Sequence, residues 1–96
     1  MFGMEMRTVM FTLYGKIVRK NHIIRDMQVT DGSDVSRTAK VAHAVTAMSR
    51  EFDLPEPIWL DRNIREFQRR SRTRFTQDNF IEAISFDFLE IAVLDE

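Results

Sequence analysis

The chain contains no cysteine, only two prolines and only three glycines in 96 residues. Without cysteine it can form neither a disulfide nor a thiolate metal site. The glycines, at positions 3, 15 and 32, lie too far apart for a glycine-rich phosphate loop. No apolar run approaches the roughly 20 residues that span a bilayer, and the first residues lack the basic and apolar regions of a secretory signal. We therefore expect a cytoplasmic protein that binds no membrane and holds no cofactor.

The chain also has almost no excess of either charge, because its formal net charge is −1. Such a chain has no global attraction to nucleic acid or to an anionic surface, so any binding of that kind must be local. A hydrophobic content of 44% with 30% charged residues is typical of a globular protein. The length predicts a single domain over residues 1–96, in which we expect residues 1–5 to be loosely ordered.

The near-neutral total hides a separation of charge near the C-terminus. Six arginines and a single acid, Glu66, lie between positions 62 and 74, and six acids without a base follow between 78 and 96. The arginines are Arg62, Arg65, Arg69, Arg70, Arg72 and Arg74. Arginine binds carboxylates and phosphates through a fixed fork of donors, so this segment is the best candidate for a functional surface.

The first third of the chain predicts a β-hairpin. Residues 7–18 alternate between apolar and polar positions, as in a half-buried strand. Gly15 within it suggests a bulge or a close backbone contact. Lys20 and Asn21 suit a tight turn, with His22 expected in that turn, and a return strand is expected from about 23 to 29.

A helix from about 34 to 52 follows, capped by Ser33 or Asp34. Its apolar stripe consists of Val41, Val45, Met48 and Phe52, with His43 on the exposed side. The two prolines, at 55 and 57, end this element.

The last part predicts a short strand at 58–60, a second helix and a final strand near 86–94. Asp61 or Asn63 can cap that helix, and with Asn63 as the cap Glu66 completes a capping box. One side then carries Ile64, Phe67, Ser71 and Phe75, and another carries Arg62, Arg65, Arg69 and Arg72. We expect Phe67 and Phe75, which lie with Ile64, to belong to the core. Helix beyond Ser71 is questionable, since the residues that follow favour strand or loop. The predicted fold class is α+β: a small, mostly antiparallel sheet with helices packed on one face, in the order β-hairpin, helix, short strand, helix, C-terminal strand.

Three interpretations of the arginines stay open. They bind a protein partner or a second copy of the chain, they bind the phosphates of nucleic acid, or they form a solvated face that pairs in part with the C-terminal acids. Trp59 is either a core residue or an interface anchor, because tryptophan and arginine dominate binding hot spots. An uncovered sheet edge would also favour homodimerisation or strand addition by a partner.

The sequence offers no catalytic pattern, since nothing places a nucleophile beside a base and an orienting acid. Two histidines without cysteine make a poor transition-metal set. Residues 31–34 start like a calcium loop but lack its later ligands, which favours a turn. A small metal-dependent hydrolase would need Asp78, Glu82 and Asp87 to come together. We therefore expect a binding or interaction module without catalytic apparatus, with nucleic-acid binding as the alternative.

The C-terminal third resembles a small bacterial family of uncharacterised proteins. The resemblance lies in Pro57-Ile58-Trp59-Leu60, Asn63, Glu66-Phe67, Thr73-Arg74-Phe75, Asp78, Phe80 and the run from Phe86 to Ile91. It is looser in the hairpin between residues 15 and 29. It implies a bacterial cytosolic protein and transfers no activity and no site residue.

Overall fold

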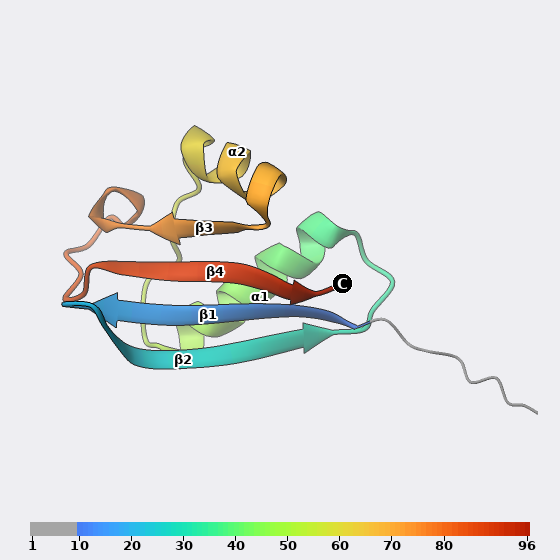
Figure 1. Ribbon diagram of the computed structural model, residues 1–96, viewed down its shortest axis with the longest axis horizontal. Helices are drawn as coiled ribbons and strands as arrows, with labels where there is room; N and C mark the ends of the chain where they lie inside the picture. The colour runs from blue at the N-terminus through green and yellow to red at the C-terminus, as the bar shows by residue number, and fades with distance from the viewer. Residues whose placement is uncertain (1–9) are drawn as a thin grey trace, which may run out of the picture.

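The computed structural model describes residues 10–96, so the expectations for residues 1–5 and for the first residues of the 7–18 strand lie outside the described part. Four strands form one antiparallel sheet in the order β2-β1-β4-β3, and two helices accompany it (Figure 1). The predicted α+β class is confirmed. The elements are β1 Phe11–Arg19, β2 His22–Asp31, α1 Arg37–Glu51, α2 Asp61–Arg70, β3 Arg72–Phe75, the 3₁₀ turn η1 Gln77–Asn79 and β4 Phe88–Asp95.

The predicted hairpin forms with the predicted two-residue turn. Lys20 and Asn21 both adopt positive φ, at 51° and 66°, which matches the right-handed twist of the flanking strands. The sequence-based prediction that His22 lies in the turn is wrong, because His22 begins β2 and pairs with Arg19. β2 reaches Asp31 and is therefore longer than the predicted return strand.

The core lies between the sheet and α1, and its helical stripe is the predicted one. Val41, Val45, Met48 and Phe52 are all buried. Ser36, rather than Ser33 or Asp34, caps α1 by accepting a hydrogen bond from the amide of Ala39 at 3.1 Å. A Cβ at Gly15 would overlap the Sδ of Met48, so glycine permits the close contact between strand and helix that the sequence suggested.

The short strand is located differently from the sequence-based prediction. Residues 58–60 form no strand, because the backbone of Ile58 is hydrogen-bonded to Asn79. The Ile58 amide donates to the Asn79 carbonyl at 2.6 Å, and the Ile58 carbonyl accepts from the Asn79 side chain at 2.7 Å. The fourth strand is instead β3, which follows α2. The final strand forms at Phe88–Asp95, close to the predicted range.

The second helix begins with a different cap from the predicted one, and it ends at Ser71, beyond which the sequence made helix questionable. Leu60 is the N-cap residue, and Asn63, which we expected as a cap, lies one turn inside, where its side chain accepts the Leu60 amide at 3.0 Å. The Asn63–Glu66 capping box is therefore absent. Ser71 ends α2 with a left-handed φ of 57°, which turns the chain directly into β3. Arg72 and Phe75 accordingly belong to a strand and do not share a helix face with Arg65 or Ile64.

Candidate functional site

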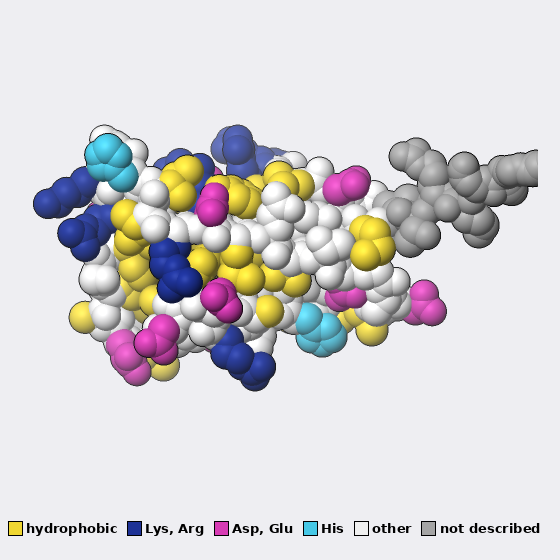
Figure 2. Space-filling model, turned by 90° about the horizontal axis from the view of Figure 1, so that it is seen from below, with side chains coloured by type: hydrophobic (Ala, Val, Ile, Leu, Met, Phe, Trp, Pro, Cys, Tyr) yellow, Lys and Arg dark blue, Asp and Glu magenta, His cyan; other side chains and the backbone are white. Residues whose placement is uncertain are grey.

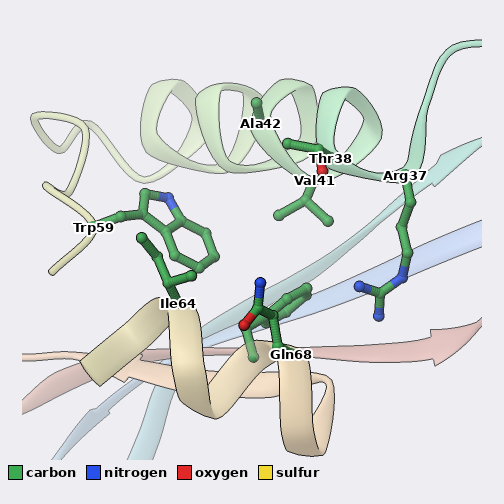
Figure 3. Close-up of a pocket in the computed structure, with 8 residues that line it drawn as sticks. Arg37, Thr38, Val41, Ala42, Trp59, Ile64 and Gln68 are labelled. Atoms are coloured by element: carbon green, nitrogen blue, oxygen red, sulfur yellow. The ribbon is translucent and has the colours of Figure 1, made fainter. Parts of the chain in front are cut away.

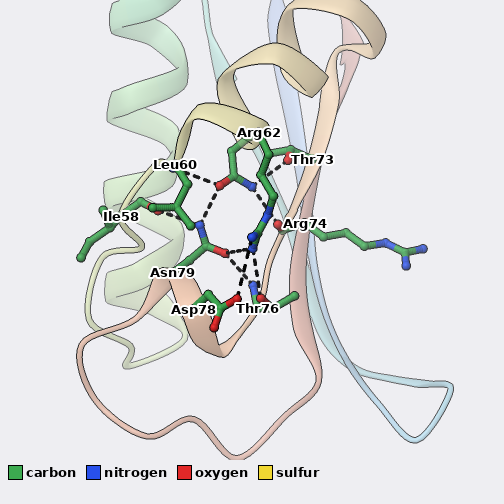
Figure 4. A network of polar contacts seen from close by, with 9 residues as sticks. Ile58, Leu60, Arg62, Thr73, Arg74, Thr76, Asp78 and Asn79 are labelled. Carbon is green, nitrogen blue, oxygen red and sulfur yellow. Dashed lines mark hydrogen bonds and ion pairs between the residues drawn. The ribbon is translucent and has the colours of Figure 1, made fainter.

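A buried amide network fixes α2 against β3 and the preceding loop (Figure 4). Asn63 and Asn79 are fully buried, and each uses both amide hydrogens and accepts two hydrogen bonds. Asn79 donates to the Oδ1 of Asn63 at 2.7 Å, and Asn63 donates to the Oγ1 of Thr73 and to the carbonyl of Arg74, both at 2.9 Å. A buried amide with every partner in place rigidifies its surroundings, so this network positions the arginines of α2 and β3.

Arg62 belongs to this network and not to a free binding face. Its guanidinium donates to the Oδ1 of Asn79 at 3.2 Å and to the Oγ1 of Thr76 at 3.3 Å, and it lies 3.8 Å from the carboxylate of Asp78 (Figure 4). These three contacts hold η1 against the start of α2. Of the six predicted arginines, Arg62 therefore has the clearest structural role.

Arg74 is also engaged, on the face of the sheet opposite α1. Its Nε donates to Glu90 at 3.0 Å, and its guanidinium stacks 4.2 Å from the centre of the Phe88 ring. Lys16 approaches the same carboxylate at 3.3 Å. Burial alone would raise the pKa of Glu90, but the hydrogen bonds from Arg74 and Lys16 outweigh it and hold that pKa below its ordinary value.

The other four arginines, Arg65, Arg69, Arg70 and Arg72, are exposed. Within residues 10–96, no carboxylate lies within ion-pair distance of any of them. Arg65 and Arg69 are four residues apart on one face of α2 and border a shallow hollow together with Gln68. Arg70 and Arg72 border another, polar hollow beside β3, so the predicted cluster divides into two neighbouring surfaces.

An apolar groove of about 440 Å³ runs between α1 and α2 (Figure 3). Its lining consists of Arg37, Thr38, Val41, Ala42, Trp59, Ile64, Phe67 and Gln68. In the close-up, Trp59 lies at one end and Arg37 at the other. The volume is within the range of roughly 300–1,000 Å³ typical of ligand pockets. Ile64 is 42% exposed, although the sequence placed it on the core side of the helix.

Trp59 combines the two roles that the sequence left open. One part of its ring packs edge-on against Phe67 and Phe75, with centroid distances of 5.6 and 5.1 Å, as in a core. The side chain is only partly buried and also lines the groove. Phe67 and Phe75 are themselves buried, as predicted.

Arg37 was not among the predicted site residues. Its Nε donates to Glu96 at 2.6 Å, a terminal nitrogen donates to Ser71 at 3.1 Å, and the guanidinium stacks 5.1 Å from the centre of the Phe67 ring. It therefore forms one end of the groove and ties α1 to the end of β4. No local signal marks it, because it stands alone at a helix start, far from the arginine-rich segment.

The acids that a metal-dependent hydrolase would require do not come together. Across residues 10–96, no group of three or more His, Cys, Asp or Glu side chains is arranged to hold a metal ion. His43 is exposed, as expected. None of the helices in this part of the chain is long and apolar enough to cross a membrane.

Comparison with known proteins adds no assignment: no protein-family model, no curated protein and no solved structure matches this chain. The resemblance to a small bacterial family stays a prediction, and function has to be argued from the surfaces just described.

Proposed function

We propose that the protein is an interaction module that binds an acidic, amphipathic segment of a partner protein on α2. The observation that carries this proposal is the position of Gln68, which lines both the apolar groove and the hollow of Arg65 and Arg69. An apolar site and an unpaired basic site therefore adjoin on one helix. A segment with apolar side chains on one side and carboxylates beside them fits both at once.

The composition of this surface supports a protein partner. Binding energy at protein interfaces concentrates in tryptophan, tyrosine and arginine, surrounded by residues that exclude water. Here Trp59 and Ile64 offer partly exposed apolar area, and Arg65 and Arg69 supply forked donors for carboxylates. Trp59 is held in place by Phe67 and Phe75, so little side-chain entropy is lost when a partner packs on it.

Nucleic-acid binding is the weaker alternative. The polar hollow beside β3 carries five bases, Lys16, Arg62, Arg70, Arg72 and Arg74, and three acids, Glu66, Asp78 and Glu90. Three of those bases are already ion-paired with Asp78 or Glu90. Within this hollow only Arg70 and Arg72 are left to neutralise phosphates, and a net charge of −1 adds no long-range attraction.

Trp59 gives a direct test, because it is the only tryptophan and lines the groove. Peptides selected from a random display library on the immobilised protein are titrated into the protein while Trp59 emission is followed. We expect the selected peptides to combine acids with large apolar residues and to shift the emission. The double substitution Arg65→Glu/Arg69→Glu should weaken binding about tenfold or more, because it places glutamates opposite the acids of the peptide.

Arg50→Glu is the matched control, since Arg50 is exposed at the end of α1 and lines none of the three hollows described. This variant should bind the peptides as the unchanged protein does. Peptides without acids, or equal binding by the double variant, would refute the proposal. Labelled single- and double-stranded oligonucleotides are titrated in parallel by anisotropy, and saturable binding that falls steeply with salt would favour the nucleic-acid alternative.

A further inference from the structure

The outer edge of β2 is the longest unpaired backbone edge of the sheet. β2 has ten residues without glycine or proline, and no strand within residues 10–96 pairs with its outer side. The opposite edge, β3, has four residues and is covered by α2, whose Asn63 donates to the Arg74 carbonyl. A long uncovered edge is a template for pairing with another chain. Of the two edges, only β2 is therefore available for pairing with a strand of another chain.

Apolar area accompanies this open edge. Figure 2 views the molecule from the side of β2 and shows hydrophobic side chains gathered across the middle of that face. Ile23 and Ile24 are 54% and 49% exposed, and Met27 and Val29 are only partly buried against the core. Met27 and Val29, in the middle of β2, would therefore add side-chain burial to the hydrogen bonds that strand addition would form.

The register shows which β2 residues share a face. Met27 pairs with Gly15, and Val29 pairs with Leu13. Both Leu13 and Gly15 lie on the α1 side of the sheet. Directly opposite residues of an antiparallel pair share a face. Arg25, Met27, Val29 and Asp31 therefore lie on the α1 side, and Asp26, Gln28 and Thr30 lie on the open side.

β2 is complementary to itself in one antiparallel register, with a two-fold axis at Gln28. In that register Arg25, which also lies 3.7 Å from Glu51 of its own copy, lies opposite Asp31 of the second copy, and Met27 lies opposite its Val29. Because of the two-fold symmetry, each of these pairs occurs twice. Asp26 then faces a threonine, and Gln28 faces Gln28 of the second copy.

The neighbouring registers lack this complementarity. An axis at Asp26 or at Arg25 places like charges opposite each other, which is destabilising. An axis at Met27 places Arg25 opposite a valine, so neither Arg25 nor Asp31 meets a residue of opposite charge. Charge therefore selects the register centred on Gln28.

We propose that the protein forms a homodimer in which the β2 strands of two copies pair antiparallel about Gln28, with both α1 helices on the same side of one continuous sheet. This goes beyond the proposed function, because β2 lies at the sheet edge opposite α2 and β3. The surface of α2 stays accessible in such a dimer, and each copy presents one.

Sedimentation equilibrium over a wide concentration range tests the dimer. We expect the mass to rise from 11.4 kDa to twice that value with increasing concentration. Arg25→Asp and Asp31→Arg each place like charges opposite one another at both pairs, and each variant alone should dimerise at least about tenfold more weakly. In an equimolar mixture of the two variants, both pairs are complementary again, so the mixture should form a heterodimer.

Recovery in the mixture separates a specific register from a general loss of stability, since a merely unfolded variant is not rescued by another. Arg72→Glu, on β3, is the matched control and should dimerise normally. A mass of 11.4 kDa at every concentration would overturn the proposal. So would a dimer that tolerates both β2 variants, or a mixture that dimerises no better than either variant alone. The Arg65→Glu/Arg69→Glu variant should still dimerise, so failure of the proposed function would not affect this result.

Discussion

At the scale of single residues, two asparagines do more for this fold than their polar character suggests. Asn63 and Asn79 are completely buried, yet the residue type is usually exposed. Each is accommodated because all its donors and acceptors have partners, mostly on the backbone of Ile58, Leu60, Arg74 and Thr76. They therefore join a loop, a helix, a strand and a 3₁₀ turn that have no regular backbone pairing with one another.

Asn63→Ala should lower the free energy of unfolding by roughly 3 kcal/mol. The substitution leaves the amide of Leu60, a side-chain hydrogen of Asn79 and the carbonyl of Arg74 without this partner, and a buried group that loses its hydrogen bond costs about 1–3 kcal/mol. Chemical denaturation measures the change. Gln68→Ala is the control, because Gln68 is exposed on the same helix, and it should stay within about 0.5 kcal/mol. A loss below 1 kcal/mol for Asn63→Ala would mean that other groups or water replace the amide.

Residue types alone could not separate the structural arginines from the exposed ones. All six predicted arginines stand within thirteen positions and have the same chemistry. What distinguishes Arg62 and Arg74 is the approach of Asn79, Asp78 and Glu90 from later in the chain. Long-range pairing of this kind leaves no local pattern, so the candidate surface could be predicted but not its division.

At the scale of elements, the sheet surface opposite α1 carries a row of alternating charges. Arg74 on β3 pairs with Glu90 on β4, Glu90 with Lys16 on β1, and Lys16 with Asp26 on β2. Glu90 is the central acid of this row and contacts both neighbouring bases. Tyr14 donates to Asp26 at 2.7 Å, and this hydrogen bond raises the pKa of Tyr14. Cross-strand polar pairs therefore contribute to the open face of the sheet.

Glu90→Gln should reduce the acid sensitivity of the fold. Because the pKa of Glu90 is lowered in the folded state, its stabilisation is present above the unfolded pKa of about 4.3 and is lost as the pH falls through the folded pKa. Urea denaturation at pH 7, 5 and 3 should show the unchanged protein losing about 1 kcal/mol more than the variant, the size expected for partly exposed pairs. Glu82→Gln, at an exposed acid that forms no ion pair within residues 10–96, should follow the unchanged protein. Equal acid sensitivity of Glu90→Gln and the unchanged protein would contradict this role.

The elements with a strong local pattern were predicted well. Alternation predicted the hairpin, and the helical repeat of Val41, Val45 and Met48 predicted α1. The sequence predicts the short strand at 58–60 because those residues are apolar. β3 has the sequence Arg-Thr-Arg-Phe, in which only Phe75 is apolar, so alternation of apolar and polar residues is too weak to predict it. β3 forms because Ser71 reverses the chain and β4 offers a paired edge, and both conditions are tertiary.

At the scale of the whole molecule, α1 and α2 share one core although a groove separates their outer surfaces. Buried side chains from β1, α1, α2, β3 and β4 belong to a single cluster, in which Phe67 and Phe75 of the second half join Leu13 and Met48 of the first. Neither half has a core of its own, and domains of this size usually unfold in one step.

We therefore expect unfolding to be a single cooperative transition. Trp59 fluorescence reports on the α2 half and far-ultraviolet circular dichroism on the whole chain, so the two denaturation curves should have the same midpoint. Asn63→Ala should shift both midpoints together, although it acts only in the second half. An earlier transition in fluorescence than in circular dichroism would show that α2 and β3 unfold as a separate unit.

The sequence by itself determined the α+β class, the hairpin and its turn, the helix that covers the sheet and the segment in which the unpaired arginines lie. These follow from periodicity, turn chemistry and charge order, all of which act between neighbours along the chain. Only the tertiary structure decided which arginines are engaged, where the fourth strand forms, and that Trp59 and Gln68 border one groove between the helices. Those features depend on contacts between residues far apart in sequence, chiefly the paired amides of Asn63 and Asn79, which join segments that have no shared local pattern.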